Sequence, residues 1–264
     1  MNDDLKFFSD GAAYERLMGR WSQLAGATFL DWLELPKGLR WLDVGCGNGA
    51  FSELLMGRFP PSRLHGIDLS DAQVAYARMR EALRHAKFDT GDAQSLPFDD
   101  DSFDVATMAL VISFVPDPAQ AVSEMERVVR PGGWVASYMW DAPAGGLPAQ
   151  PIAAAARALG LVAAAPRIPG TVFTRADFET LWKEAGLEDV ETCRIDIQTT
   201  YIDANDFWES NTLLASPIAN MVKNLTGTEQ DRIKLYLAET LPKDRDGHIT
   251  SSAFANAVKG RVID

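Results

Sequence analysis

Residues 41–49 read Trp-Leu-Asp-Val-Gly-Cys-Gly-Asn-Gly. The apolar run 39–44 is typical of a buried strand, and helical spacing begins again at 50–58. Glycines between the two permit a tight turn and let a ligand approach the backbone closely, because no Cβ stands in the way. The N-terminus of the helix adds unpaired N–H groups. These features predict a binding site built on Gly45, Gly47 and Gly49.

A carboxylate at the end of the next strand completes this prediction. Residues 64–68 form a second short apolar run, which ends at Asp68, 19 residues after Gly49. A carboxylate at that point can accept hydrogen bonds from both hydroxyls of a ribose. The sequence therefore predicts a nucleoside-bearing cofactor at the carboxyl ends of parallel strands.

The remaining pattern predicts the sheet. Apolar runs alternate with helical segments over residues 39–140, which indicates a parallel sheet with right-handed crossovers and helices on both faces. The expected strands are 39–44, 64–68, 87–90, 103–110, 134–140, 190–199 and 249–258. The expected helices are 11–34, 50–58, 72–86, 119–129, 151–164 and 175–185, with two or three more in 203–240. Thr174 is a candidate N-cap and Gly186 a helix stop.

We therefore predict an α/β fold, a Rossmann-like, mostly parallel seven-stranded sheet with helices on both faces and helical cap or insertion segments. Because we find no clean linker, the expected organisation is one domain over residues 1–264. Its core is expected at about 38–140, 172–200 and 246–260, and its cap and insertions at about 1–35, 141–171 and 201–245.

The identity of the cofactor is not settled by the glycines alone. Gly45, Gly47 and Ala50 also satisfy the G-x-G-x-x-G/A pattern of dinucleotide-binding proteins. A buried carboxylate at Asp43 would repel a pyrophosphate and suits a cationic ligand better. A second carboxylate, Asp92, follows the third strand, where it could meet an adenine amino group. No histidine or lysine stands out as the proton relay of a hydroxyl dehydrogenase.

These segments resemble the motifs of class I S-adenosylmethionine-dependent methyltransferases, and within them the quinone-biosynthesis-like (methyltransferase domain 11 type) branch. The resemblance is close over residues 39–140. It rests on residues 41–49, 66–70 (Gly-Ile-Asp-Leu-Ser), 91–98 (Gly-Asp-Ala-Gln-Ser-Leu-Pro-Phe), 102–104 (Ser-Phe-Asp) and 127–133 (Arg-Val-Val-Arg-Pro-Gly-Gly). Residues 14–21 resemble more loosely the N-terminal cap of related small-molecule enzymes.

The resemblance implies a role for individual residues. Gly45, Gly47 and Gly49 would line the methionine part of S-adenosyl-L-methionine beside the backbone of Cys46, and Asp43 would lie near the amino group or behind the loop. Asp68 would bind the ribose, Leu69 would pack on the adenine, and Asp92 and Ala93 would hold the adenine edge. Ala109 and Leu110 would border the methyl donor, and Tyr14 and Arg20 would close over the cofactor. Cys46 is not expected to be a nucleophile.

The expected activity is in-line transfer of a methyl group to a small organic acceptor, with no catalytic residue identified and no metal. The alternatives are an NAD-dependent oxidoreductase and a non-catalytic S-adenosylmethionine-binding module. After the fourth strand the chain reads Met-Ala-Leu-Val-Ile-Ser-Phe (108–114), which lacks the Asn/Asp-Pro-Pro-aromatic motif of nucleobase and amide N-methyltransferases.

The composition and net charge limit the partners and the cellular location that we expect for this protein. The 264 residues carry 25 Lys and Arg against 37 Asp and Glu, a formal net charge of −12, which argues against a nucleic-acid partner. We find no membrane-spanning run and no signal peptide at the acidic N-terminus, and two cysteines cannot form a disulfide framework. We expect a cytoplasmic monomer or homodimer that does not associate with a membrane.

Overall fold

The structure is a computed structural model that describes residues 11–163, 174–212 and 217–263, with side chains from Trp21 onward except at Pro217. Seven strands form one sheet in the order β3-β2-β1-β4-β5-β7-β6. The strands are β1 (Arg40–Val44), β2 (Arg63–Asp68), β3 (Lys87–Thr90), β4 (Phe103–Ala109), β5 (Val129–Trp140), β6 (Glu188–Tyr201) and β7 (Ile249–Arg261). The first five are parallel, and β7 runs antiparallel between β5 and β6. The predicted mostly parallel seven-stranded fold is confirmed.

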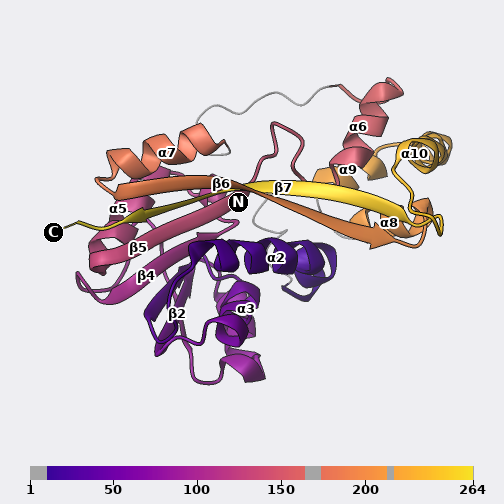
Figure 1. Ribbon diagram of the computed structural model, residues 1–264. Helices are drawn as coiled ribbons and strands as arrows, with labels where there is room; N and C mark the ends of the chain where they lie inside the picture. Colours follow the sequence, from indigo (N-terminus) through magenta and orange to yellow (C-terminus); the bar gives the residue numbers. More distant parts are fainter. Residues whose placement is uncertain (1–10, 164–173, 213–216, 264) are drawn as a thin grey trace.

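Helices cover both faces of this sheet (Figure 1). Helix α2 contacts α3 and α4 on one side, whereas α5 and α7 contact each other on the opposite side. The helices are α2 (Gly11–Leu33), α3 (Ala50–Arg58), α4 (Asp71–Met79), α5 (Pro118–Val128), α6 (Gln150–Ala158), α7 (Arg175–Glu184), α8 (Ala204–Thr212), α9 (Pro217–Lys223) and α10 (Gly227–Thr240). Short 3-10 turns are η1 (Glu81–Leu83) and η2 (Ile112–Phe114). Among the described residues, no helix has the length and apolar character needed to cross a bilayer.

The direction of α2 matters for the site. Near its N-terminal half, Trp21 donates a hydrogen bond to the hydroxyl of Tyr201 at 3.1 Å, at the end of β6. At its C-terminal end, Trp32 contacts the ammonium group of Lys259, which also faces Trp134 of β5, the register partner of Val105 near the start of β4. Helix α2 therefore runs from the carboxyl edge of the parallel strands to their amino edge.

Strands β6 and β7 form a long antiparallel pair that projects beyond the other strands toward α8 and α10 (Figure 1). The last residue of β5, Trp140, pairs with Ala255, whereas β7 begins six residues earlier at Ile249, which pairs with Tyr201. We call residues 196–201 and 249–254 the overhang. It stands above the carboxyl edge of the parallel strands, because β7 is antiparallel to β5.

Three predicted boundaries were wrong. The helix expected at 72–86 ends at Met79, because Arg80 is extended (φ −71°, ψ 118°) and its side chain turns to the glycine loop. The helix expected at 151–164 ends at Ala158, and Gly160 follows in the left-handed region (φ +69°). The fifth strand begins at Val129 and continues through Pro131, where a register shift against β4 absorbs the irregularity.

Two other predictions at helix ends are confirmed. The Thr174 hydroxyl accepts a hydrogen bond from the backbone N–H of Asp177, whose carboxylate accepts the backbone N–H of Thr174 in return. This reciprocal arrangement satisfies two N–H groups that have no partner within the helix. Gly186 ends α7 in the left-handed region, with φ of +82°.

Candidate functional site

The glycine loop joins β1 to α3 at the carboxyl edge of the sheet. Gly45, Gly47 and Gly49 have φ angles of +72°, +51° and +82°, all in the region that L-residues rarely adopt. The N–H groups of Gly45 and Cys46 both donate to the carbonyl of Ile67, at 2.7 and 3.0 Å. The turn is therefore fastened to the end of β2, beside Asp68.

The three glycines lack a side chain for different reasons. A Cβ on Gly45 would stand 2.5 Å from the side chain of Val111, and one on Gly49 would stand 2.8 Å from Leu83. These two glycines therefore allow close packing of the loop against neighbouring segments. A Cβ on Gly47 would meet nothing within 4 Å. The middle of the loop thus faces open space, which is the condition that a ligand approaching the backbone requires.

The carboxylate of Asp68 lies directly against this open part of the loop. One oxygen accepts the N–H of Gly47 and the other accepts the N–H of Ser70, each at 2.9 Å. Burial raises the pKa of Asp68, while these two hydrogen bonds oppose the rise. The next residue, Leu69, has 63% of its surface exposed, so an apolar face stands free beside the carboxylate.

Asp43 is placed behind the loop rather than in the open space. It is fully buried, and one oxygen accepts a hydrogen bond from the Ser52 hydroxyl of α3 at 2.6 Å. The other oxygen has no partner among the described residues. Burial raises the pKa of Asp43 from its ordinary 3.8 to about 7, and the negative charge of Asp68 adds to the rise. Near neutral pH this carboxyl group is therefore partly protonated and partly charged.

We expect this group to make stability depend on pH. Between the unfolded pKa of 3.8 and the folded pKa of about 7, the folded protein holds a proton that the unfolded chain has released. The stabilisation is complete below the lower value and is lost as the pH rises through the higher one. Asp43→Asn keeps an acceptor for Ser52 and cannot ionise. From pH 5 to pH 7 the free energy of unfolding of wild type should fall by about 2–3 kcal/mol relative to this variant. Denaturant titrations of wild type and Asp43→Asn at several pH values measure this difference. If the free energies of unfolding of the two proteins change with pH in the same way, the prediction is wrong.

The Cys46 thiol is buried and poorly suited to act as a nucleophile. Its sulfur lies against Gly66, where a Cβ would approach it to 2.9 Å. Burial, with the negative charges of Asp43 and Asp68, raises the pKa of the thiol well above its ordinary value. The neutral thiol is a poor nucleophile, in keeping with the prediction made from the sequence.

Asp92 and Ala93 follow β3, and both are half-buried. The Asp92 carboxylate accepts hydrogen bonds from the backbone N–H of Gln94 at 2.9 Å and from the side-chain amide of Gln94 at 3.1 and 3.2 Å. Because β3 is parallel to β2 and adjacent to it, both Asp68 and Asp92 lie at the carboxyl edge of the sheet. The structure thus brings the two expected carboxylates to the same edge as the glycine loop.

The end of β4 borders the loop from the other side. Ala109 is half-buried, and Leu110 has a φ of +61°, which is unusual for a residue with a side chain. The Leu110 N–H donates to the Tyr138 carbonyl at 2.9 Å, and this bond holds the chain in place as it turns out of the strand. The turn directs Val111 onto Gly45. The predicted roles of Tyr14 and Arg20 depend on side chains that lie outside the described residues.

Sequence reasoning missed the residues that support the loop. Ser52 bonds to Asp43, Val111 packs on Gly45, and Arg80 donates to the Asn48 carbonyl at 2.6 Å while it forms an ion pair with Glu53. Only Ser52 has a local signal, because it lies in the first turn of the helix that the loop introduces. The other two come from distant segments, so spacing alone could not have found them.

Comparisons with known proteins agree with this geometry. Residues 42–137 match the family described as "Methyltransferase domain". Demethylmenaquinone methyltransferase of Staphylococcus aureus is 39% identical over 101 residues, which are 38% of this chain and 42% of that protein. The matched segment is thus less than half of either chain. The family match over residues 42–137 contains Gly45, Gly47, Gly49, Asp43, Asp68 and Asp92.

Solved structures extend the likeness to almost the whole chain. The YcgJ protein of Bacillus subtilis aligns with a TM-score of 0.57 at 18% identity, covering 91% of this chain and 98% of that one. A phosphoethanolamine N-methyltransferase of Haemonchus contortus, solved with S-adenosylhomocysteine, aligns with a TM-score of 0.57 at 19% identity, covering 96% of this chain and 56% of that one. Residues 42–137 of this chain thus match the methyltransferase domain family, and the sheet around them has the same fold as these two solved structures.

Proposed function

We propose that this protein binds S-adenosyl-L-methionine and transfers its methyl group to a small organic acceptor. The observation that carries the proposal is the open space at Gly47, directly beside the Asp68 carboxylate and the exposed Leu69. An aminoacyl chain fits against a backbone without a Cβ, a ribose fits a carboxylate, and a purine fits an apolar side chain. The residues present therefore suit this cofactor, and demethylmenaquinone methyltransferase is similar to the chain over 101 residues.

The arrangement of strands favours this reading over a dinucleotide. Dinucleotide-binding sheets have the parallel order 3-2-1-4-5-6. Here the antiparallel β7 stands between β5 and β6, and a buried carboxyl group, Asp43, lies behind the glycine turn. A pyrophosphate at this turn would lie near that carboxyl group, one oxygen of which has no hydrogen-bond partner among the described residues, whereas a sulfonium compound carries positive charge itself.

The residues of this chain would contribute to such a reaction by holding the cofactor and the acceptor in place. When bound, S-adenosylmethionine supplies an activated methyl group whose thioether leaves without being protonated. Gly47 and Asp68 would fix the nucleoside end, while the turn at Leu110 and Val111 would form the wall beside the methyl group. Holding two reactants in line can supply up to about 7–11 kcal/mol of the barrier. A separate acid or base residue is therefore not required for an acceptor that is already nucleophilic.

The overhang supplies candidate contacts for the acceptor. Thr199 and Ser251 are register partners on β6 and β7, are 5% and 2% exposed, and lie beyond the carboxyl end of β5. Within the described part of the chain, neither hydroxyl has a hydrogen-bond partner. Buried polar groups are nearly always paired in folded proteins. We therefore infer that the acceptor, which must lie above this edge of the sheet, carries an oxygen or nitrogen that these hydroxyls bind.

Calorimetry with two ligands tests the proposal. We expect S-adenosylhomocysteine to bind and NADH to give no heat, because the loop and Asp68 suit the first ligand. Transfer from methyl-labelled S-adenosylmethionine to a panel of phenols, amines, thiols and carboxylic acids then measures the activity. Binding of NADH alone would indicate an oxidoreductase, and binding of S-adenosylhomocysteine with no transfer to any acceptor would indicate a non-catalytic binding module. Both Cys46 and Cys193 are free, which fits the reducing, cytoplasmic setting that we propose for the reaction.

A further inference from the structure

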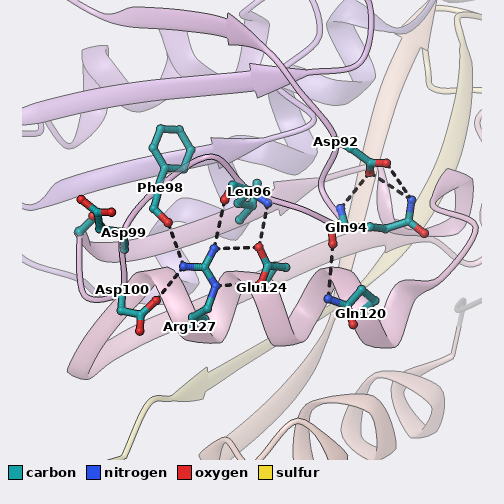
Figure 2. Close-up of polar contacts among 10 residues, drawn as sticks. Asp92, Gln94, Leu96, Phe98, Asp99, Asp100, Gln120, Glu124 and Arg127 are labelled. Atoms are coloured by element: carbon teal, nitrogen blue, oxygen red, sulfur yellow. Dashed lines mark hydrogen bonds and ion pairs between the residues drawn. The ribbon is translucent and has the colours of Figure 1, made fainter.

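Residues 91–102, which join β3 to β4, contact α5, and the guanidinium group of Arg127 makes several of the hydrogen bonds that hold them there (Figure 2). One terminal nitrogen, Nη1, donates to the Phe98 carbonyl and to the Asp100 carboxylate, both at 2.8 Å. The other, Nη2, donates to the Leu96 carbonyl at 3.1 Å. We call residues 91–102 the Asp92 loop, because Asp92 lies near its start. A guanidinium presents its donors in a rigid fork, so these contacts fix the loop in both position and direction.

Glu124, one turn earlier on α5, completes the clamp. Its two carboxylate oxygens accept hydrogen bonds from Nε and Nη2 of Arg127, each at 2.8 Å. The oxygen that faces Nη2 also accepts the backbone N–H of Leu96 at 2.8 Å. The hydrogen bonds with Arg127 lower the pKa of Glu124 and raise that of Arg127, so both groups stay charged. Arg127 and Glu124 together therefore bind both backbone polar groups of Leu96.

A second set of contacts connects the same helix with Asp92 itself. Gln94 donates to the Asp92 carboxylate from its backbone and from its side chain. The side-chain oxygen of Gln94 accepts the N–H of Asp117 at 3.0 Å, and its carbonyl accepts the Gln120 amide at 3.4 Å. Figure 2 shows the two sets side by side along α5. Gln94 is only two residues from Leu96, so a shift of the clamped part of the loop would move the residue that orients Asp92.

We propose that Arg127 is a positioning residue for the adenine site: through the Asp92 loop it fixes the direction in which the Asp92 carboxylate faces the exocyclic amino group of adenine. The inference rests on the proposed function, since Asp92 can accept a hydrogen bond from an adenine only if an adenosyl cofactor binds here. Arg127 acts on such a ligand only indirectly. Its effect is transmitted by Leu96 and Gln94.

The test compares two ligands that differ at one group. S-adenosylhomocysteine carries the adenine amino group, and S-inosylhomocysteine has a carbonyl oxygen in its place, which a carboxylate repels. Calorimetry should show that wild type prefers the adenosyl compound by about tenfold or more, the factor expected for a hydrogen bond to a charged group. In Arg127→Met this preference should fall to about twofold or less, mainly through weaker binding of the adenosyl compound. Arg127→Lys keeps the charge without the fork and should restore only part of the preference.

Arg130 provides a matched control three residues further along. Its guanidinium donates to Asp104 at 2.6 Å and to the Pro131 carbonyl, and forms no hydrogen bond or ion pair with residues 91–102. Arg130→Met removes the same group from the same region, and its preference between the two ligands should equal that of wild type. If Arg127→Met fails to fold, Glu124→Met carries the test, because it removes the acceptor of the Leu96 N–H and leaves Arg127 in place.

Each outcome has a distinct meaning. If wild type binds neither ligand, the proposed function fails and the inference falls with it. If wild type binds both without preference, Asp92 does not read the adenine, and the inference is overturned while the cofactor site stands. If the variants at Arg127 bind both ligands more weakly by the same factor, Arg127 only stabilises the fold, and its assignment as a positioning residue is wrong.

Discussion

Gly47→Val should abolish binding of S-adenosylhomocysteine, with a loss of affinity of about 100-fold or more, equivalent to roughly 3 kcal/mol. Gly47 is the loop glycine whose missing Cβ would meet nothing within 4 Å, so an added isopropyl group occupies the space that the ligand needs. Its φ of +51° also disfavours a branched side chain. Calorimetry on the folded variant measures the effect.

Backbone strain needs a control of its own. Gly186 ends α7 with a φ of +82° and, like Gly47, has open space where a Cβ would stand. Gly186→Val therefore imposes a similar strain far from the glycine loop and should leave affinity unchanged. If Gly47→Val does not fold, Gly47→Ala supplies a smaller intrusion at the same point. Wild-type affinity in either folded variant at position 47 would show that the ligand does not approach this loop.

Asp68→Ala should weaken the binding of S-adenosylhomocysteine by about 1.5–3 kcal/mol, or about 10- to 150-fold in affinity. This is the scale of hydrogen bonds to a charged acceptor. The carboxylate stands at the carboxyl end of β2 beside the open part of the loop, where ribose hydroxyls would reach it. Because Asp68 also holds the N–H groups of Gly47 and Ser70, part of any loss could arise from a loosened turn.

A second ligand separates the two contributions. The 2′-deoxy analogue of S-adenosylhomocysteine lacks one of the hydroxyls that Asp68 would bind. Wild type should prefer the ribose form by about tenfold, and Asp68→Ala should show no preference. Asp89→Ala is a suitable control, because this exposed carboxylate on β3 pairs with His65 and Arg78 away from the loop. An Asp68→Ala variant that keeps the ribose preference would contradict the assignment.

The parts of this fold that could be predicted are those with a local cause. Glycines in a turn, the N-cap at Thr174 and the alternating apolar runs act within a few residues, and the structure confirms them. The early end of α4 at Met79 has no local cause, because neither Gly nor Pro occurs there. Arg80 leaves the helix to contact Asn48 and Glu53, 32 and 27 residues away, and only tertiary packing creates that contact.

The same distinction applies to the sheet and to the site. Nothing near residue 249 signals that β7 inserts between β5 and β6, since strand order depends on which surfaces pack together. The sequence placed Asp43 beside the loop but could not decide between the open side and the buried side. The hydrogen bond from Ser52 decides it, and that bond exists only once α3 has packed against β1.

The overhang has a consequence for how this protein could change its choice of substrate. Residues 202–248 leave the sheet after Tyr201 and return at Ile249, and these two residues are register partners. The two ends of this excursion therefore meet across one strand pair, whatever lies between them. The entropy of closing a flexible loop grows slowly, by about 0.6 kcal/mol for each doubling of length. Evolution or an engineer could thus exchange this segment for a shorter or longer one while residues 42–137 stay unchanged.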